Sequence, residues 1–246
     1  MLKIDMFPCL NDNYGFLIHD TESGETATID TPEAAKIEEA LEKNGWKLTQ
    51  IWNTHHHFDH VGGNLELAER HGASITGPAH DVKRIPELTR GVSDGEVFKL
   101  GVHDIRVMET PGHTRSHIIY YAKDAGAAFV GDTIFTLGCG RLFEGSPADM
   151  HKSLTAICEL PDGTKLYCAH EYTLSNAAFA LTVEPENQDL LDYIETAKAL
   201  RLAGTPTVPT TVAQEKRTNP FVRAGSAERL GEIRSAKDSF QGTLPA

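Results

Sequence analysis

The stretch Thr54–His60, THHHFDH, follows an apolar run and precedes two glycines. If this stretch leaves a strand and enters a loop, His55 and His57 point to the same side, because side chains in extended chain alternate with period two. Asp59 and His60 follow where the glycines allow the chain to turn. Two imidazoles on one side are typical of metal ligands. The pattern therefore predicts one metal ion at the first pair and allows a second ion at the following Asp-His pair.

Three distant segments offer further ligands of the same chemical types. His113 lies in ETPGHTRSH, Asp132 in AAFVGDTIF and His170 in KLYCAHEYT, each directly after an apolar strand-like run or its turn. One such residue alone is more often structural. Four such segments in one chain favour a site at the rim where these strands end. His56 lies between the first pair and should face elsewhere, so it receives no role.

Composition limits the class of protein. The chain has 246 residues, 40% of them hydrophobic, and a net charge of −12. This predicts an ordered protein, and the negative charge disfavours nucleic acid as the main partner. No apolar run approaches the ~18 residues of a transmembrane helix, and the N-terminal residues do not resemble a signal peptide. Four scattered cysteines without a CxxC pair favour the reducing cytoplasm. We expect a cytoplasmic monomer that does not bind membranes.

The order of elements predicts two β-sheets packed together with helices outside, followed by a helical part. Polar turns separate apolar runs in the first part, whereas the second part shows helical patterns and no convincing strand. The residues 204–221 between the last two helical patterns contain three prolines and are expected to form a long loop. We predict domains at 1–172 and 173–246. The expected strands are 2–7, 14–19, 26–30, 50–53, 105–109, 118–121, 127–131 and 165–169, and the expected helices are 32–44, 65–70, 147–160, 176–182, 188–202 and 227–237.

Taken together, the four metal-ligand segments resemble the metallo-β-lactamase fold superfamily. The resemblance implies an αββα sandwich of two mixed β-sheets, with a two-metal site between the sheet edges. Asp132 argues against antibiotic hydrolysis, because the β-lactamases of this superfamily lack the bridging aspartate, and His57 disfavours the flavodiiron-type branch, which has an acid there. The resemblance implies that one ion is held by His55, His57 and His113, the other by Asp59, His60 and His170, and both by Asp132.

Stretches that extend beyond the metal ligands indicate which family of the superfamily the chain resembles. GDTIFTLGCGRLFEG, AHEYT, TVPTTVAQEKRTNPFVR and IRSAKDSF resemble the glyoxalase II, or hydroxyacylglutathione hydrolase, family. That family cleaves the thioester of S-D-lactoylglutathione to glutathione and D-lactate, the second step of methylglyoxal detoxification. Glutathione carries two carboxylates, which Arg and Lys bind directly. The family's substrate-binding positions fall on Arg141, Tyr172, Arg234 and Lys237. Phe143 departs from members that have an aromatic hydroxyl at that position.

The implied chemistry is hydrolysis by a metal-bound hydroxide. Two divalent ions about 3.5–4 Å apart can share a water and lower its pKa toward 7. Asp59 could also accept a hydrogen bond from this nucleophile. The ligand set suits Zn²⁺, our expectation, and also accepts Fe or Mn. Asp30 and Thr54 are candidates to orient the ligands, with a helix cap as the alternative for Asp30.

The sequence alone also allows other functions. Another enzyme of the superfamily, such as a persulfide dioxygenase or a lactonase, would share the metal ligands but should lack the basic pair near the C-terminus. A tRNA-processing nuclease would need a basic arm. A metal-storing or regulatory protein without turnover would need neither the bridging Asp132 nor the pair Arg234 and Lys237.

Overall fold

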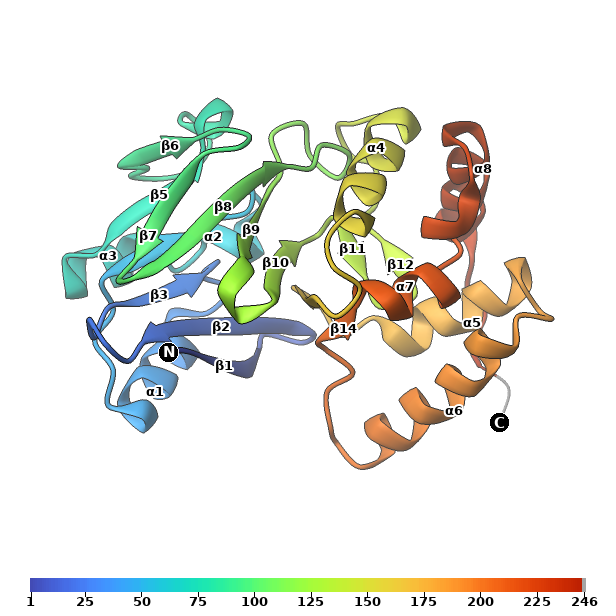
Figure 1. Cartoon of the computed structure of the whole chain (residues 1–246), viewed down its shortest axis with the longest axis horizontal. Coiled ribbons are helices and arrows are strands. Elements are labelled where there is room, and N and C mark those ends of the chain that lie inside the picture. The colour runs from blue at the N-terminus through green and yellow to red at the C-terminus, as the bar shows by residue number, and fades with distance from the viewer. Residues whose placement is uncertain (245–246) are drawn as a thin grey trace. The chain divides into compact units, whose positions relative to one another are not determined.

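The computed structural model describes residues 1–244 (Figure 1). Its chain falls into two compact units. Unit 1 comprises Met1–Glu109 and Ser116–Gly131. Unit 2 comprises Thr110–Arg115 and the residues from Asp132 onward. In the part of the chain that the structure describes, no helix has the length and apolarity needed to cross a membrane.

Unit 1 begins with a six-stranded sheet in the order β1 to β6. β1, β2 and β3 pair antiparallel, and β3 to β6 pair parallel, so this sheet is mixed. Helices connect the parallel strands, as parallel pairing requires. The strands are β1 (Leu2–Cys9), β2 (Asn13–Asp20), β3 (Thr26–Ile29), β4 (Gln50–Trp52), β5 (Ser74–Pro78) and β6 (Arg90–Val92), and the helices are α1 (Ala34–Asn44), α2 (Phe58–Val61), α3 (Asn64–His71) and the 3₁₀ turn η1 (Ala79–Asp81).

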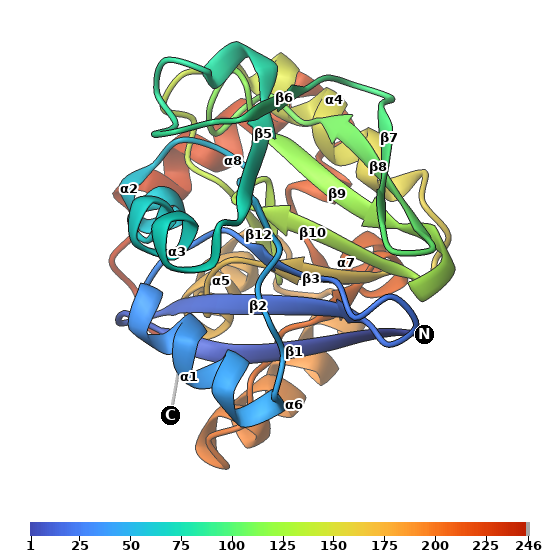
Figure 2. The ribbon, with the colours of Figure 1, turned by 90° about the vertical axis from the view of Figure 1, so that its left-hand side faces the viewer.

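The helix α1 covers one face of this first sheet, and Figure 2 shows it beside β1 and β2. Its apolar side chains recur at helical spacing, which predicts a buried stripe. Ile37 and Leu41 are buried against Leu17 of β2 and Ile51 of β4. Gly45 ends the helix in the left-handed conformation that glycine adopts without a Cβ penalty.

The other face of the first sheet packs on a second sheet. In unit 1 the second sheet runs β10-β9-β8-β7 with antiparallel neighbours. The ring of Trp52 in β4 lies 4.8 Å from Phe98 and 5.4 Å from Tyr120 in the facing sheet. These buried rings form the layer between the sheets. The strands are β7 (Val97–Leu100), β8 (His103–Glu109), β9 (Ile118–Ala122) and β10 (Ala127–Gly131), and the 3₁₀ turn η2 (Lys123–Ala125) joins the last two.

Unit 2 is mainly helical. The apolar faces of α5 and α6 pack around Leu137, with Ala177, Ala180, Leu190 and Ile194 as the buried core. α4 begins with a capping box, because Ser146 accepts a hydrogen bond from the backbone N–H of Asp149, whose carboxylate reaches back. The helices are α4 (Pro147–Cys158), α5 (Thr173–Val183), α6 (Gln188–Leu202), α7 (Val212–Thr218), η3 (Val222–Ala224) and α8 (Ala227–Ser239), and the strands are β11 (Ile134–Phe135), β12 (Gly138–Cys139), β13 (Lys165–Cys168) and β14 (Thr210–Thr211).

The predicted fold class is confirmed: two mixed sheets with flanking helices and a C-terminal helical region. The prediction of one long loop over 204–221 is wrong. This segment contains β14, which pairs with β13, and the seven-residue helix α7, whose first turn is capped by Thr211. Both elements are too short to show a repeating apolar pattern, so periodicity alone misses them. The domain division at 172/173 stays a prediction.

Candidate metal centre

The histidine loop, residues Thr54–His60, begins after β4 and ends inside α2. His55 is buried, and its Nε2 lies 3.0 Å from Nδ1 of His57. Two nitrogens bound to one tetrahedral Zn²⁺ at about 2.0–2.1 Å lie roughly 3.3 Å apart. The pair is therefore spaced as two ligands of one ion, which agrees with the alternation expected from the sequence.

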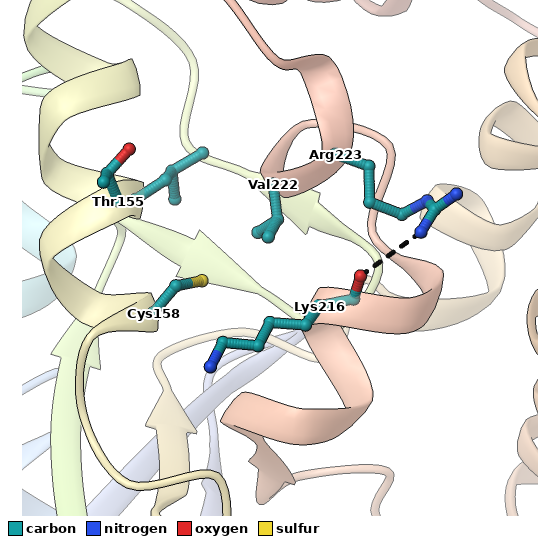
Figure 3. Close-up of a pocket in the computed structure, with 6 residues that line it drawn as sticks. Thr155, Cys158, Lys216, Val222 and Arg223 are labelled. Carbon is teal, nitrogen blue, oxygen red and sulfur yellow. Dashed lines mark hydrogen bonds between the residues drawn. The ribbon is translucent and has the colours of Figure 1, made fainter.

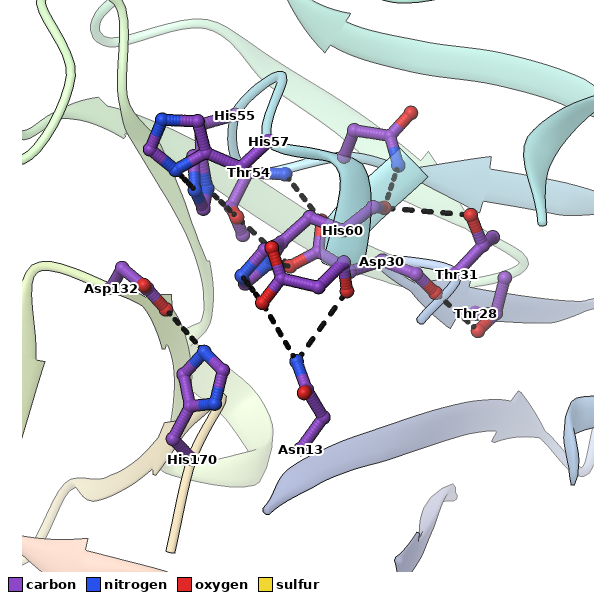
Figure 4. A network of polar contacts seen from close by, with 12 residues as sticks. Asn13, Thr28, Asp30, Thr31, Thr54, His55, His57, His60, Asp132 and His170 are labelled. Carbon is purple, nitrogen blue, oxygen red and sulfur yellow. Dashed lines mark hydrogen bonds and ion pairs between the residues drawn. The ribbon is translucent and has the colours of Figure 1, made fainter. Parts of the chain in front are cut away.

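Asp59 and His60 form the second part of the loop. One carboxylate oxygen of Asp59, Oδ2, lies 3.5 Å from Nε2 of His60. The side-chain amide of Asn13 donates to the same oxygen at 3.1 Å, and so fixes the carboxylate from β2 (Figure 4). These two residues offer one nitrogen and one oxygen ligand within 4.8 Å of each other.

A single carboxylate, Asp30, holds both ends of the histidine loop. Its Oδ1 accepts from the backbone N–H of Thr54 at 2.8 Å, and its Oδ2 lies 2.7 Å from Nδ1 of His60 (Figure 4). His60 therefore carries its proton on Nδ1, and its Nε2 lone pair is directed at the Asp59 side. The alternative assignment of Asp30 as a helix cap is wrong, because Glu33 occupies the N-cap position of α1.

Thr54 is placed to orient both Asp30 and His55, as the sequence-based prediction expected. Its hydroxyl donates to Oδ2 of Asp30 at 2.9 Å and lies 3.0 Å from Nδ1 of His55. Asp30 adopts a left-handed backbone with φ of 56°, which is costly for a residue other than glycine. This strain is offset by the three hydrogen bonds that the carboxylate receives.

Unit 2 contains the other predicted ligands, His113, Asp132 and His170. All three are buried, and each follows a strand end or its turn. Oδ2 of Asp132 lies 3.3 Å from Nε2 of His113, and Oδ1 lies 3.4 Å from Nε2 of His170 (Figure 4 draws the second pair). Each oxygen of one carboxylate thus faces a different imidazole. This is the arrangement that a carboxylate bridging two ions requires.

The imidazoles of His113 and His170 in unit 2 are oriented by contacts other than those with Asp132. Nδ1 of His113 donates to the carbonyl oxygen of Arg141 at 2.8 Å, so that Nε2 keeps its lone pair toward Asp132. The ring of His170 stacks on Tyr172 with centroids 4.7 Å apart and an interplanar angle of 1°. Both imidazoles therefore present the nitrogen that faces the carboxylate.

Two of the predicted basic residues of unit 2, Arg141 and Arg234, share one acidic partner. Asp238 contacts Nε of Arg141 at 3.3 Å and Nη2 of Arg234 at 2.8 Å. Arg234 is buried and also donates to the carbonyl oxygen of Cys139 at 2.9 Å. Lys237 donates to the carbonyl oxygen of Ser175 at 3.0 Å. Burial, then the positive charge of Arg234, lowers the pKa of Lys237 to about 8.

The turn Phe135–Cys139, between Asp132 and Arg141, is held by side chains that the sequence analysis missed. The backbone N–H of Leu137 donates to Glu215 at 2.9 Å, and Asn219 donates to the carbonyl oxygen of Gly138 at 2.9 Å. Asn176 donates to the carbonyl oxygen of Thr136 at 3.1 Å. The available signal was the i, i+4 spacing of Glu215 and Asn219, which places both on one helix face.

Glu215 is a fully buried carboxyl. Burial raises its pKa from 4.5 to about 7, although Thr210, Asn219 and the N–H of Leu137 donate to it and favour the charged form. A buried carboxyl without such partners would cost several kcal/mol. The turn and the carboxyl therefore satisfy each other's polar groups.

A surface pocket of about 390 Å³ in unit 2 is a separate feature (Figure 3). None of the predicted ligands lines it. Its cations are already paired, Lys216 with Asp162 at 2.7 Å and Arg223 with Glu184 at 2.9 Å. Burial raises the pKa of the Cys158 thiol to about 11, so it is not a ready nucleophile. The pocket is lined by Leu154, Thr155, Cys158, Lys216, Val222 and Arg223.

Two family models match consecutive parts of the chain. Residues 23–170 match the metallo-beta-lactamase superfamily, and residues 171–240 match the hydroxyacylglutathione hydrolase C-terminus. A hydroxyacylglutathione hydrolase from Maricaulis maris is 53% identical, with 97% of this chain and 99% of that protein covered. Another, from Methylococcus capsulatus, is 47% identical, with 98% and 100% covered.

Solved structures resemble the fold. ETHE1 from Myxococcus xanthus has a TM-score of 0.73 and 26% identity, with 95% of this chain and 90% of that chain covered. A metallo-beta-lactamase from Staphylococcus aureus has a TM-score of 0.74 and 22% identity, with 100% and 68% covered. At that identity the second similarity concerns the fold alone.

Proposed function

Because this chain belongs to the hydroxyacylglutathione hydrolases of the metallo-β-lactamase superfamily, we propose that it uses two divalent metal ions to hydrolyse the thioester of an S-(2-hydroxyacyl)glutathione. With S-D-lactoylglutathione the products are glutathione and D-lactate, as in the second step of methylglyoxal detoxification. Relatives that carry the hydroxyacylglutathione hydrolase name match the chain over almost its whole length, including both parts that contain the predicted site residues.

The donor set fits two divalent ions. We assign His55, His57 and His113 to one ion, Asp59, His60 and His170 to the other, and Asp132 to both. The observation that carries this assignment is the Asp132 carboxylate, whose two oxygens face one histidine from each set at 3.3 and 3.4 Å. Imidazole and carboxylate together suit Zn²⁺, which we propose as the resident metal, and they also accept Fe or Mn. When bound, such ions lower the pKa of water toward 7 and polarise a carbonyl group.

Asp59 is the proposed catalytic residue of the chain itself. Asn13 fixes one oxygen of its carboxylate at 3.1 Å. The carboxylate can then accept a hydrogen bond from the attacking water and orient it toward the thioester carbonyl. Cleavage releases a thiolate, whose conjugate acid has a pKa of about 8.5, so no dedicated general acid is required. Burial raises the pKa of Cys139 to about 11, which argues against this thiol as the nucleophile.

Arg141, Tyr172, Arg234 and Lys237 are the proposed substrate-binding residues. Glutathione carries two carboxylates, and the exposed Arg141 and the half-buried Lys237 offer positive charge on an otherwise anionic protein. Arg234 is buried, so its guanidinium contributes through the residues it orders, Asp238 and the backbone of Cys139, as well as through its charge. Tyr172 fixes the ring of His170 by stacking.

The remaining expectations concern the cell and the assembly. We propose a cytoplasmic monomer with domains at 1–172 and 173–246. The four cysteines are all unpaired with one another, which supports a reducing compartment. The two family models meet between residues 170 and 171, close to the proposed boundary. The alternative of a persulfide dioxygenase or a lactonase is disfavoured, because the chain carries the C-terminal part that the hydroxyacylglutathione hydrolases have.

The deciding experiment measures loss of thioester absorbance with S-D-lactoylglutathione. We expect turnover by the purified protein, abolition by a strong chelator and recovery after Zn²⁺ is added back. The oxygen-ester analogue of the substrate is the control, and it should react far more slowly because an alkoxide leaves less readily than a thiolate. Absence of turnover in protein that holds two equivalents of metal would refute the proposed substrate.

A further inference from the structure

His56 is the member of the histidine loop that the metal centre does not use. Its Nδ1 lies 3.2 Å from Oδ2 of Asp81, and its Nε2 lies 3.3 Å from Nη1 of Arg84. An arginine can only donate, so Nε2 must accept and the ring proton must lie on Nδ1, directed at Asp81. Both nitrogens of the neutral ring therefore contact Asp81 and Arg84 and not the neighbouring His55 and His57. His56 thus connects the histidine loop to Asp81.

Asp81 is a buried centre for three segments of unit 1. Its Oδ1 accepts from Nε of Arg84 at 2.8 Å and from the hydroxyl of Ser116 at 2.7 Å, while Oδ2 faces His56. Arg84 also donates to the hydroxyl of Ser116 at 3.0 Å. The side chain of Asp81 has no exposed surface, and Arg84 balances its charge. The histidine loop is thus tied to η1 and to the start of β9 through one carboxylate.

This connection bears directly on the two flanking ligands. His56 shares a peptide bond with His55 and another with His57, and peptide bonds are planar and stiff. A histidine anchored at Nδ1 and Nε2 therefore restricts the backbone from which both ligand rings project. Asp30 fixes the loop only at its ends, at Thr54 and His60. The middle of the loop is held by His56.

We propose that His56 is a positioning residue that, through Asp81, fixes the backbone between His55 and His57 so that their ring nitrogens meet on one metal ion. The inference rests on the proposed two-metal function. It assigns His56 no contact with metal or substrate. The two ligand pairs of the loop are therefore positioned by different residues. His56 positions His55 and His57, whereas Asn13 and Asp30 position Asp59 and His60.

The test compares His56→Ala with His56→Asn. The amide nitrogen of asparagine takes the place of Nδ1 and can still donate to Asp81, whereas alanine cannot. Binding of Co²⁺ alone is measured by its visible absorbance in competition with a chelator. We expect His56→Ala to weaken binding of one of the two ions by about 10–100-fold, as changes around metal ligands generally do. The other ion should change by less than about 3-fold, and His56→Asn should stay within about 3-fold at both ions.

Ser116→Ala is the matched control. It removes a hydrogen bond to the same carboxylate but no contact to the histidine loop. Its Co²⁺ affinities should equal those of the wild type. Equal affinities of His56→Ala and wild type, or equal losses at both ions, would overturn the inference. Failure of the wild type to bind two equivalents of Co²⁺ would instead refute the metal centre itself.

A measurement on the unaltered protein covers the case in which His56→Ala does not fold. ¹⁵N spectra of the imidazoles should show His56 as the neutral Nδ1–H tautomer, both without metal and after Zn²⁺ is added. The signals of His55 and His57 should shift on metal addition. A His56 signal that moves with theirs, or that reports the Nε2–H tautomer, contradicts the anchored geometry.

Discussion

The histidine loop and the proposed ligands of unit 2 are positioned in different ways. The histidine loop brings four proposed ligands from one short segment, where strand alternation and a tight turn bring them together before Asp30, Asn13 and Asp81 fix them. His113, Asp132 and His170 come from three separate segments, each ordered by a different partner: the carbonyl oxygen of Arg141, the two facing imidazoles, and the ring of Tyr172. Local geometry therefore brings the first set together and distant residues only fix it, whereas the second set is brought together by the tertiary fold alone.

The turn after Asp132 has an unfavourable backbone conformation that contacts from distant residues stabilise. Leu137 adopts a left-handed backbone with φ of 61°, an unfavourable conformation for a branched side chain. Three polar side chains from the helical part of unit 2, including the buried Glu215, bind the backbone of this turn. The comparison leads to three predictions, which begin with the largest expected effect.

Replacement of Asp132, the proposed bridging carboxylate, should have the largest effect. Asp132→Asn keeps the shape of the side chain but removes its charge and one ligand oxygen. The side chain can then no longer bridge the two ions. We expect kcat to fall by about 10³-fold or more, with metal content reduced from two equivalents toward one. Asp59→Asn, in the histidine loop, affects one ion only and should reduce kcat by a smaller factor. Equal losses in the two variants would remove the distinction between a bridging and a terminal carboxylate.

The buried carboxyl of Glu215 should make stability depend on pH. In the unfolded chain it ionises near 4.5, and in the folded chain only near 7, because burial raises its pKa. The contribution of the neutral carboxyl to the free energy of unfolding is therefore complete below pH 4.5. This contribution falls by about 3 kcal/mol as the pH rises to about 7. The free energy of unfolding of the wild type should fall by that amount relative to Glu215→Gln over this range. Metal-ligand titrations cancel in the difference.

An exposed glutamate provides the control for this measurement. Glu232 lies on the surface of α8 beside Arg229. Glu232→Gln should follow the pH dependence of the wild type. Parallel curves for wild type and Glu215→Gln would show that Glu215 is ionised throughout.

The smallest predicted effect concerns Lys237, whose pKa is lowered to about 8 by burial, then by Arg234. Lysine is cationic below its pKa, so the KM for the anionic thioester should rise, by up to about tenfold, as pH increases through 8. Lys237→Arg keeps its charge over this range and should abolish the rise while metal content stays unchanged. Identical pH profiles of KM in the two proteins would exclude Lys237 from carboxylate binding.

The sequence by itself determined the features that depend on local spacing. Strand alternation separated His55 and His57 from His56. Apolar runs with turn residues predicted the fold class, eight of the strands and most of the helices, but not the strands β5, β6 and β7. The residue types at three strand ends indicated the other proposed ligands. Each of these follows from backbone periodicity, which a sequence shows directly.

Only the tertiary structure decided which groups meet across long separations. It showed that Asp30 fixes the histidine loop and does not cap a helix, that His56 is anchored on Asp81, and that Asp238 joins Arg141 to Arg234. It also showed α7 within a segment expected to be a loop, with Glu215 pointing at the turn after Asp132. Such contacts leave no periodic trace in a single sequence, because the direction of a buried polar side chain depends on the packing of elements far apart in the chain.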